Sequence, residues 1–87
     1  MDYEPRLSAD ELVRMTRLRR MLCDGTAVRI REKAGLWRGE VAASCGVSLN
    51  TVISWEACTK KPRSRRALIY LDLLDRVSET SGVGFPD

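Results

Sequence analysis

The segment GVSLNTVISWE, residues 46–56, has side chains suited to contacting the edges of DNA bases. Ser48 can cap a helix that begins directly after it, and this helix would turn Val52 and Trp55 inward. The outward residues are then Leu49, Asn50, Ile53 and Ser54. In a major groove an asparagine can pair with adenine, and apolar side chains can touch thymine methyl groups. The alternative is that Leu49 and Ile53 bury against a protein neighbour, whereas Trp55 is expected in the core.

Bond-breaking chemistry finds little support in the rest of the chain. The sequence has no His, the commonest general acid or base, and we find no nucleophile–base pair and no glycine-rich phosphate loop. Its three cysteines, Cys23, Cys45 and Cys58, lack metal-site spacing, and we expect reduced thiols that serve as small hydrophobic residues. We therefore expect neither an enzyme nor a metal or other cofactor.

The charge of the chain is unevenly distributed. The net charge is only +3, but residues 59–66, TKKPRSRR, hold five basic residues and no acidic one. Residues 14–33 hold seven basic residues against Asp24 and Glu32. Local basic patches of this kind attract an anionic polymer such as DNA, although a basic loop can also be plain solvated surface.

Caps and apolar spacing predict five helices and no strand. The first, over residues 9–23, opens with a capping box at Ser8 and Glu11 and ends at Asp24-Gly25. The second, over 27–34, would be capped by Thr26 and closed by Gly35, and the third, over 38–45, would end at Gly46. The fourth covers 49–57, and the last runs over 65–79 and ends near Gly82. The predicted inward residues of the first three helices are Leu12, Met15, Leu18, Leu22, Ala27, Ile30, Ala34, Val41, Ala42 and Cys45.

Length and composition indicate one small globular domain. The chain has 87 residues, of which 44% are hydrophobic, so its core is marginal and a partner chain can add stability. We divide it into a capping helix (1–25), a core (26–79) and a flexible tail (80–87). No apolar run approaches a membrane span, and the acidic N-terminus has no signal core, so we expect a cytoplasmic protein.

Residues 35–62, GLWRGEVAASCGVSLNTVISWEACTKKP, resemble the Cro/repressor-type (XRE-like) helix-turn-helix family of phage and bacterial regulators. The resemblance covers about residues 27–76. The positions in register are Gly35, Leu36, Val41, Ala42, Gly46, Val47, Ser48, Thr51, Val52, Trp55, Glu56 and Pro62. It implies a lambda-repressor-like fold, here with an extra N-terminal helix. In this family the second helix of the motif, here 49–57, is the recognition helix that enters the DNA groove. The sequence departs from the family pattern at Trp37, Arg38, Gly39 and Cys58, the last of which replaces the glycine that usually ends the recognition helix.

The resemblance also implies roles for residues beyond the base-reading face. The loop after the recognition helix runs beside the DNA backbone in this family, which implies phosphate contacts there. The residues expected at phosphates are Arg38, Ser48, Thr51, Lys60, Lys61 and Arg63. Arg31 and Glu56 occupy positions that often form a partly buried ion pair, which we interpret as structural.

The expected function is therefore sequence-specific binding of double-stranded DNA by a phage or prophage repressor or Cro-like protein. The alternative is a protein-interaction module, such as an antitoxin, on the same scaffold. The last helix has two apolar stripes, one of which includes Ile69, Leu73 and Val77. The first helix or a second copy of the chain can cover that stripe, and we expect a homodimer at least on DNA.

Overall fold

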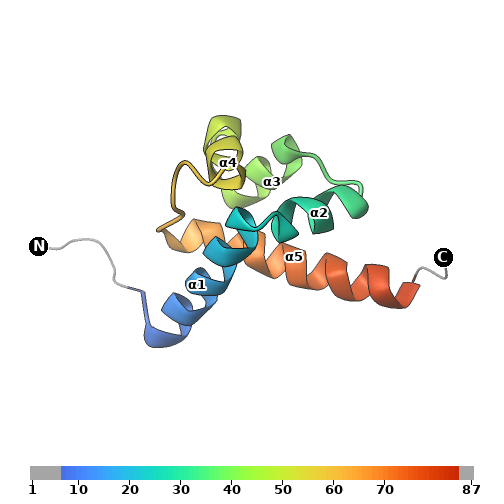
Figure 1. Cartoon of the computed structure of the whole chain (residues 1–87), viewed down its shortest axis with the longest axis horizontal. Coiled ribbons are helices and arrows are strands. Elements are labelled where there is room, and N and C mark those ends of the chain that lie inside the picture. The colour runs from blue at the N-terminus through green and yellow to red at the C-terminus, as the bar shows by residue number, and fades with distance from the viewer. Residues whose placement is uncertain (1–6, 85–87) are drawn as a thin grey trace, which may run out of the picture.

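The computed structural model describes the backbone of residues 7–84 and the side chains of residues 7–79. Within this range the chain forms five α-helices and no strand, which confirms the all-α class. The helices are α1 (Ala9–Cys23), α2 (Thr26–Lys33), α3 (Arg38–Cys45), α4 (Leu49–Glu56) and α5 (Arg65–Gly84). Figure 1 shows α3 and α4 together on one side of the long helix α5, while α1 approaches α5 from the other side.

The start of α1 confirms the predicted capping box. The Ser8 hydroxyl accepts a hydrogen bond from the Glu11 N–H at 3.1 Å, and Glu11 Oε1 accepts one from the Ser8 N–H at 2.8 Å. The other carboxylate oxygen, Oε2, lies 2.7 Å from Nε of Arg65 at the start of α5. The Arg65 guanidinium, helped by the Ser8 N–H, lowers the pKa of Glu11 to about 2. One carboxylate thus both caps α1 and ties it to α5.

Four helix boundaries differ from the sequence prediction, and one of them is the end of α2, which is Lys33 and not residue 34. Thr26 is the first residue of α2 and not its cap; the left-handed Gly25 is the N-cap, and Asp24 Oδ1 accepts from the Thr26 N–H. α4 ends one residue early, at Glu56, and α5 continues to Gly84. Residues 80–84, which we assigned to a tail, are therefore helical, whereas residues 85–87 and 1–6 lie outside the described range.

One hydrophobic core joins α1 to the other four helices. Met15, Leu18 and Leu22 of α1 are at most 2% exposed, so α1 is an integral layer of the fold. Leu12 was predicted in the same stripe but is 49% exposed, although its neighbour Glu11 pairs with Arg65 of α5. The other buried hydrophobic residues are Ala27, Val41, Ala42, Cys45, Val52, Trp55, Ala67, Leu68, Tyr70, Leu71 and Leu74. The predicted inward residues Ile30 and Ala34 are half-buried.

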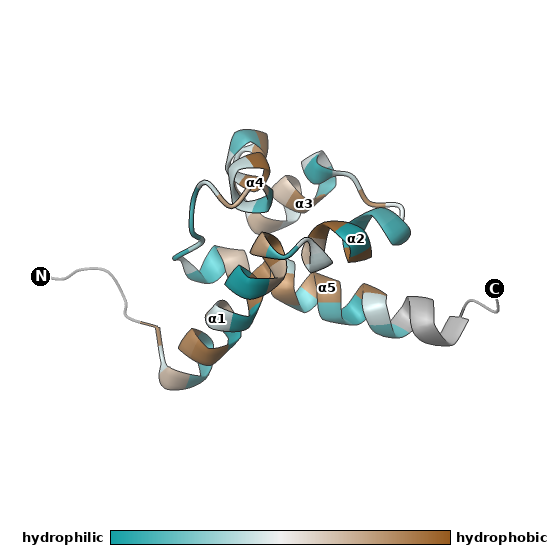
Figure 2. Ribbon diagram, viewed as in Figure 1, coloured by the Kyte–Doolittle hydropathy of each residue, from teal (hydrophilic) through white to brown (hydrophobic). Residues whose placement is uncertain are grey.

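The two apolar stripes of α5 have different surroundings. Ala67, Leu68, Leu71 and Leu74 are buried and form the predicted first stripe. In the second stripe, Leu73 packs against the core and is half-buried, but Ile69 remains 43% exposed. Figure 2 shows this mixture of hydrophobic and hydrophilic residues along α5. The second stripe is therefore covered only in part within the chain.

The prediction of three reduced cysteines is wrong for two of them. Cys23, the last residue of α1, forms a disulfide with Cys58, which follows α4. The two residues are 35 positions apart in sequence, so their spacing could not predict a disulfide. The fold brings their Cα atoms to within 5.1 Å of each other. Cys45 is a buried free thiol, as expected, and burial raises its pKa.

Neither membrane insertion nor metal binding is indicated by residues 7–84. No helix in this range has the length and apolar character needed to cross a bilayer. The same range contains no cluster of three or more His, Cys, Asp or Glu side chains that could hold a metal ion.

Candidate nucleic-acid interface

α3 and α4 are joined by a tight turn that depends on Gly46. This glycine ends α3 with a φ of 73°, a left-handed conformation that most side chains resist. The Val47 N–H donates a hydrogen bond to the Ala42 carbonyl at 3.0 Å. Arg66 of α5 donates a hydrogen bond to the Gly46 carbonyl at 2.8 Å and so fixes the turn from outside. The turn therefore sets the direction in which α4 leaves α3.

Ser48 caps α4 as predicted. Its hydroxyl accepts a hydrogen bond from the Thr51 N–H at 3.2 Å and lies 2.9 Å from the Thr51 hydroxyl. Ser48 is exposed and Thr51 is half-buried. The N-terminus of α4 therefore lies at the surface. The positive end of the helix dipole there favours an anion.

The outward face of α4 is mostly the one that the sequence predicts. Leu49 is 42% exposed, Ile53 is 36% exposed and Asn50 is also exposed. Ser54 is half-buried, and its carbonyl accepts from the N–H groups of Thr59 and Lys60. On the inward side Val52 and Trp55 are 0% and 4% exposed, so the predicted orientation of α4 is confirmed. The helix thus presents two apolar side chains and an amide to the surroundings.

A buried ion pair connects the helices behind this face. Arg31 of α2 contacts both carboxylate oxygens of Glu56, with Nε–Oε2 at 2.7 Å and Nη2–Oε1 at 3.1 Å. Their side chains are 7% and 5% exposed. Arg31 Nη1 also donates to the Leu36 carbonyl, and the Tyr70 hydroxyl of α5 donates to Glu56 Oε2. Both charged groups are therefore hydrogen-bonded, Arg31 to Glu56 and a carbonyl, and Glu56 to Arg31 and Tyr70. A buried ion pair is tolerated only when its groups have such partners.

The protonation states of this cluster are held firmly. Burial alone would lower the pKa of Arg31, but the hydrogen bonds and charge of Glu56 outweigh it and raise the pKa. Burial and the adjacent Glu56 carboxylate raise the pKa of Tyr70 far above its usual value. Tyr70 therefore stays a neutral donor and Arg31 a cation at any pH near neutrality.

The same ion pair explains the charge of the surface around α4. Glu56 is the one acidic residue between positions 41 and 71, and its charge is neutralised by Arg31. The basic residues of that stretch are Lys60, Lys61, Arg63, Arg65 and Arg66. The surface contributed by residues 41–71 therefore carries positive charge and no exposed carboxylate.

Three of the five basic side chains in residues 59–66 make no ion pair with the described residues. Lys60, Lys61 and Arg63 are exposed and have no ion-pair partner among the described residues. Arg65 and Arg66 are occupied within the fold, with Glu11 and with the Gly46 carbonyl respectively. The structure thus separates three side chains that can meet phosphate from two that brace the fold.

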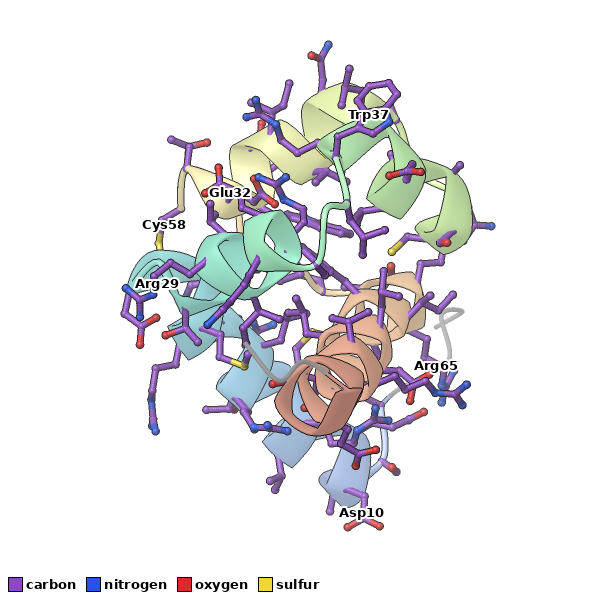
Figure 3. All side chains as sticks on the ribbon, turned by 90° about the vertical axis from the view of Figure 1, so that its right-hand side faces the viewer. Asp10, Arg29, Glu32, Trp37, Cys58 and Arg65 are labelled. Atoms are coloured by element: carbon purple, nitrogen blue, oxygen red, sulfur yellow. A yellow bond between two sulfur atoms is a disulfide. The ribbon has the colours of Figure 1, made fainter. Side chains whose placement is uncertain are left out.

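The start of α3 carries a second set of exposed side chains. The Glu40 carboxylate accepts from the Trp37 N–H at 3.0 Å, which is one half of a capping box, while the Trp37 side chain makes no capping hydrogen bond. The Trp37 ring lies across Gly39, where an added Cβ would approach the ring to 2.5 Å, so this glycine makes room for the indole. Trp37, labelled in Figure 3, is 62% exposed. Arg38 is also exposed.

The sequence predicted Arg31 and Glu56 as a pair but did not predict three of the contacts around the interface. These are the hydrogen bonds of Tyr70 to Glu56 and of Arg19 to the Pro62 carbonyl, and the Cys23–Cys58 disulfide. Each joins segments far apart in the chain and has no local spacing signal. For Cys58 one signal was present, because a cysteine stood where glycine usually ends the helix.

Comparisons of the chain with family models, with curated proteins and with solved structures find no match.

We expect Arg31→Ala to destabilise the domain by about 3–5 kcal/mol, because it strands the Glu56 charge in the core. The measurement is the free energy of unfolding in urea. Arg17→Ala is the matched control, since Arg17 makes a two-bond pair with Asp75 at the surface and should contribute about 1 kcal/mol or less. Equal losses in the two variants would contradict a buried role for Arg31.

Proposed function

We propose that the protein is a sequence-specific regulator of transcription that binds double-stranded DNA by placing α4 in the major groove. The observation that carries the proposal is the surface of residues 48–63. It combines an exposed asparagine and two exposed apolar residues on one helix face with three unpaired cations, and it has no exposed carboxylate. This combination suits a polyanion whose groove edges offer both hydrogen-bonding groups and methyl groups. The resemblance to the Cro/repressor-type helix-turn-helix family supports the same function and favours a phage or prophage regulator.

Within this proposal the residues divide into two groups. Asn50 would pair with a base, Leu49 and Ile53 would contact thymine methyl groups, and the half-buried Ser54 would serve at the edge of that face. The residues proposed at phosphates are Arg38, Ser48, Thr51, Lys60, Lys61 and Arg63. Thr51 is the least accessible of these, because its hydroxyl already lies against Ser48.

Pairing of two copies on DNA is part of the proposal. Ile69 of α5 is 43% exposed, and Leu12 and Val13 of α1 are 49% and 69% exposed. One small domain buries little surface on DNA, and a second copy adds a second half-site. These apolar residues on α1 and α5 are the surface through which we expect the copies to meet.

A protein-interaction module is the second candidate, favoured by one observation. Trp37, Leu49 and Ile53 are all large apolar side chains at the surface, and a protein partner could bury them. The two functions differ in their dependence on salt, which the next experiment measures.

The first test concerns the loop. Replacing Lys60, Lys61 and Arg63 together by Ala should weaken binding to all DNA sequences alike. It should also flatten the slope of log affinity against log salt by about 2 to 3, since each phosphate contact contributes roughly 0.9. Affinity is measured by fluorescence anisotropy at several salt concentrations, with Lys33→Ala of α2 as the control for an exposed cation elsewhere. A slope that is unchanged in the triple variant would make the loop ordinary solvated surface.

The second test concerns base reading. A preferred site is first selected from a random pool of duplexes with the parent protein. Asn50→Ala should then cost about 1–3 kcal/mol on that site and relax specificity at one base pair. Failure of the pool to enrich any sequence would argue for the protein-interaction module. Equal losses on selected and random DNA would instead make Asn50 a positioning residue.

A further inference from the structure

The segment from Cys58 to Arg65, which comprises the basic loop after α4 and the first residue of α5, is attached to α1 at three points. Cys58 is bonded to Cys23, the Pro62 carbonyl accepts from Nε and Nη2 of Arg19 at 3.0 and 2.9 Å, and Arg65 pairs with Glu11. The three α1 residues, at positions 11, 19 and 23, recur at multiples of four and therefore lie along one side of the helix. α1 thus holds the loop in place along its length. The disulfide is the attachment nearest to α4.

Cys58 occupies a backbone conformation that side chains normally avoid. Its φ is 61°, and it is the one non-glycine residue with positive φ in the described range. The chain there closes the end of α4 through hydrogen bonds from Cys58 to the Trp55 carbonyl and from Thr59 to the Ser54 carbonyl. A glycine would satisfy this turn more easily. What a cysteine adds at this position is the covalent link to α1.

Both cysteines of the pair are exposed. Figure 3 shows Cys58 at the edge of the molecule, whereas the third cysteine, Cys45, is 2% exposed. A small thiol can therefore reach the Cys23–Cys58 bond while the domain stays folded, and it cannot reach Cys45. Exposed disulfides are the ones that serve as labile or regulatory bonds.

We propose that Cys23 and Cys58 form a redox site that reacts with low-molecular-weight thiols and disulfides and controls the order of residues 58–63. In its effect on DNA the inference rests on the proposed function, because Lys60, Lys61 and Arg63 are the side chains that would meet phosphate. In its effect on the loop it stands independently of DNA.

The reaction is a two-step exchange. The thiolate of a small monothiol attacks one sulfur of the Cys23–Cys58 bond, which breaks to give a mixed disulfide and one protein thiolate. A second monothiol releases the other cysteine, and the two protein sulfurs take up the two protons. The protein gains two electrons, and two monothiols are oxidised to one small disulfide. The small disulfide reverses the reaction through the same intermediate.

Reduction should loosen the loop without unfolding the domain. The Arg19 and Arg65 contacts still hold its far end, and the core contains neither sulfur of the pair. Cys58, freed from α1, no longer fixes the near end, so DNA must order that part of the loop on binding. Ordering about one residue's backbone corresponds to roughly tenfold weaker affinity for the selected duplex.

The experiment measures two properties of the oxidised and reduced parent protein, with glutathione and glutathione disulfide as the redox couple. Amide hydrogen exchange, read residue by residue, should become faster on reduction at residues 58–60, whose N–H groups are hydrogen-bonded to the Trp55 and Ser54 carbonyls, and stay unchanged in the core of α3 and α4. Affinity for the selected duplex should fall about tenfold and recover when the disulfide is restored. Native alkylation followed by mass measurement confirms which thiols are free.

Three variants separate the covalent link from other effects. Cys58→Gly removes the link but suits the left-handed turn, so its loop exchange and DNA affinity should match those of the reduced parent in both redox states, even where Cys23 takes up one glutathione as a mixed disulfide. Cys23→Ser leaves Cys58 without its protein partner, so glutathione disulfide can form only a mixed disulfide at Cys58 and should not restore the slow exchange of the loop. Cys45→Ala keeps the pair and should respond like the parent.

The outcomes distinguish this inference from the proposed function. A loop whose exchange is the same in both redox states, or a disulfide that is reduced only when the whole domain unfolds, would overturn the redox site. Equal DNA affinity in both states would overturn its control of binding. Loop exchange that responds to glutathione while neither state binds any DNA would support the redox site and reject the proposed function.

Discussion

The ion pair between Arg31 and Glu56 is the interaction on which the rest of the structure depends. It joins α2 to the end of α4, and Tyr70 of α5 adds a third helix to the same carboxylate. Because two charges are buried together, loss of either leaves the other in the core, so the three helices are fixed as a unit. The pair also neutralises the one acidic residue between positions 41 and 71. A single contact therefore both orients α4 and keeps its surroundings positive.

The sequence predicted those parts of the fold whose signals are local. The capping box at Ser8, the left-handed Gly46 and the hydroxyl of Ser48 each act within four residues, and the structure has all three. The inward Val52 and Trp55 follow from helical periodicity alone, which in turn leaves Leu49 and Asn50 outside. The outward face of α4 could be predicted in this way because the position of a residue along a helix determines the side on which its side chain lies.

What the sequence could not predict is how distant segments meet. Periodicity placed Leu12 with Met15, yet whether a turn of α1 is covered depends on where α5 crosses it. In the same way, the sequence named Lys60, Lys61 and Arg63 as phosphate residues, but only the fold shows that Arg65 and Arg66 of the same segment are engaged with Glu11 and the Gly46 carbonyl. The Cys23–Cys58 bond depends on the path of the loop along α1. α1, expected as an added cap, is thus part of the core and the support of the loop.

The central claim is that the exposed face of α4 and the loop after it form the surface that meets DNA. The most direct measurement is a titration of the isotope-labelled protein with the selected duplex, followed by the shifts of its backbone amide signals. The claim predicts that the largest changes fall in residues 48–54 and 58–63, with a smaller change at Arg38 and none in residues 72–79 of α5. Changes concentrated on α1 and α5, with α4 unaffected by saturating duplex, would contradict it.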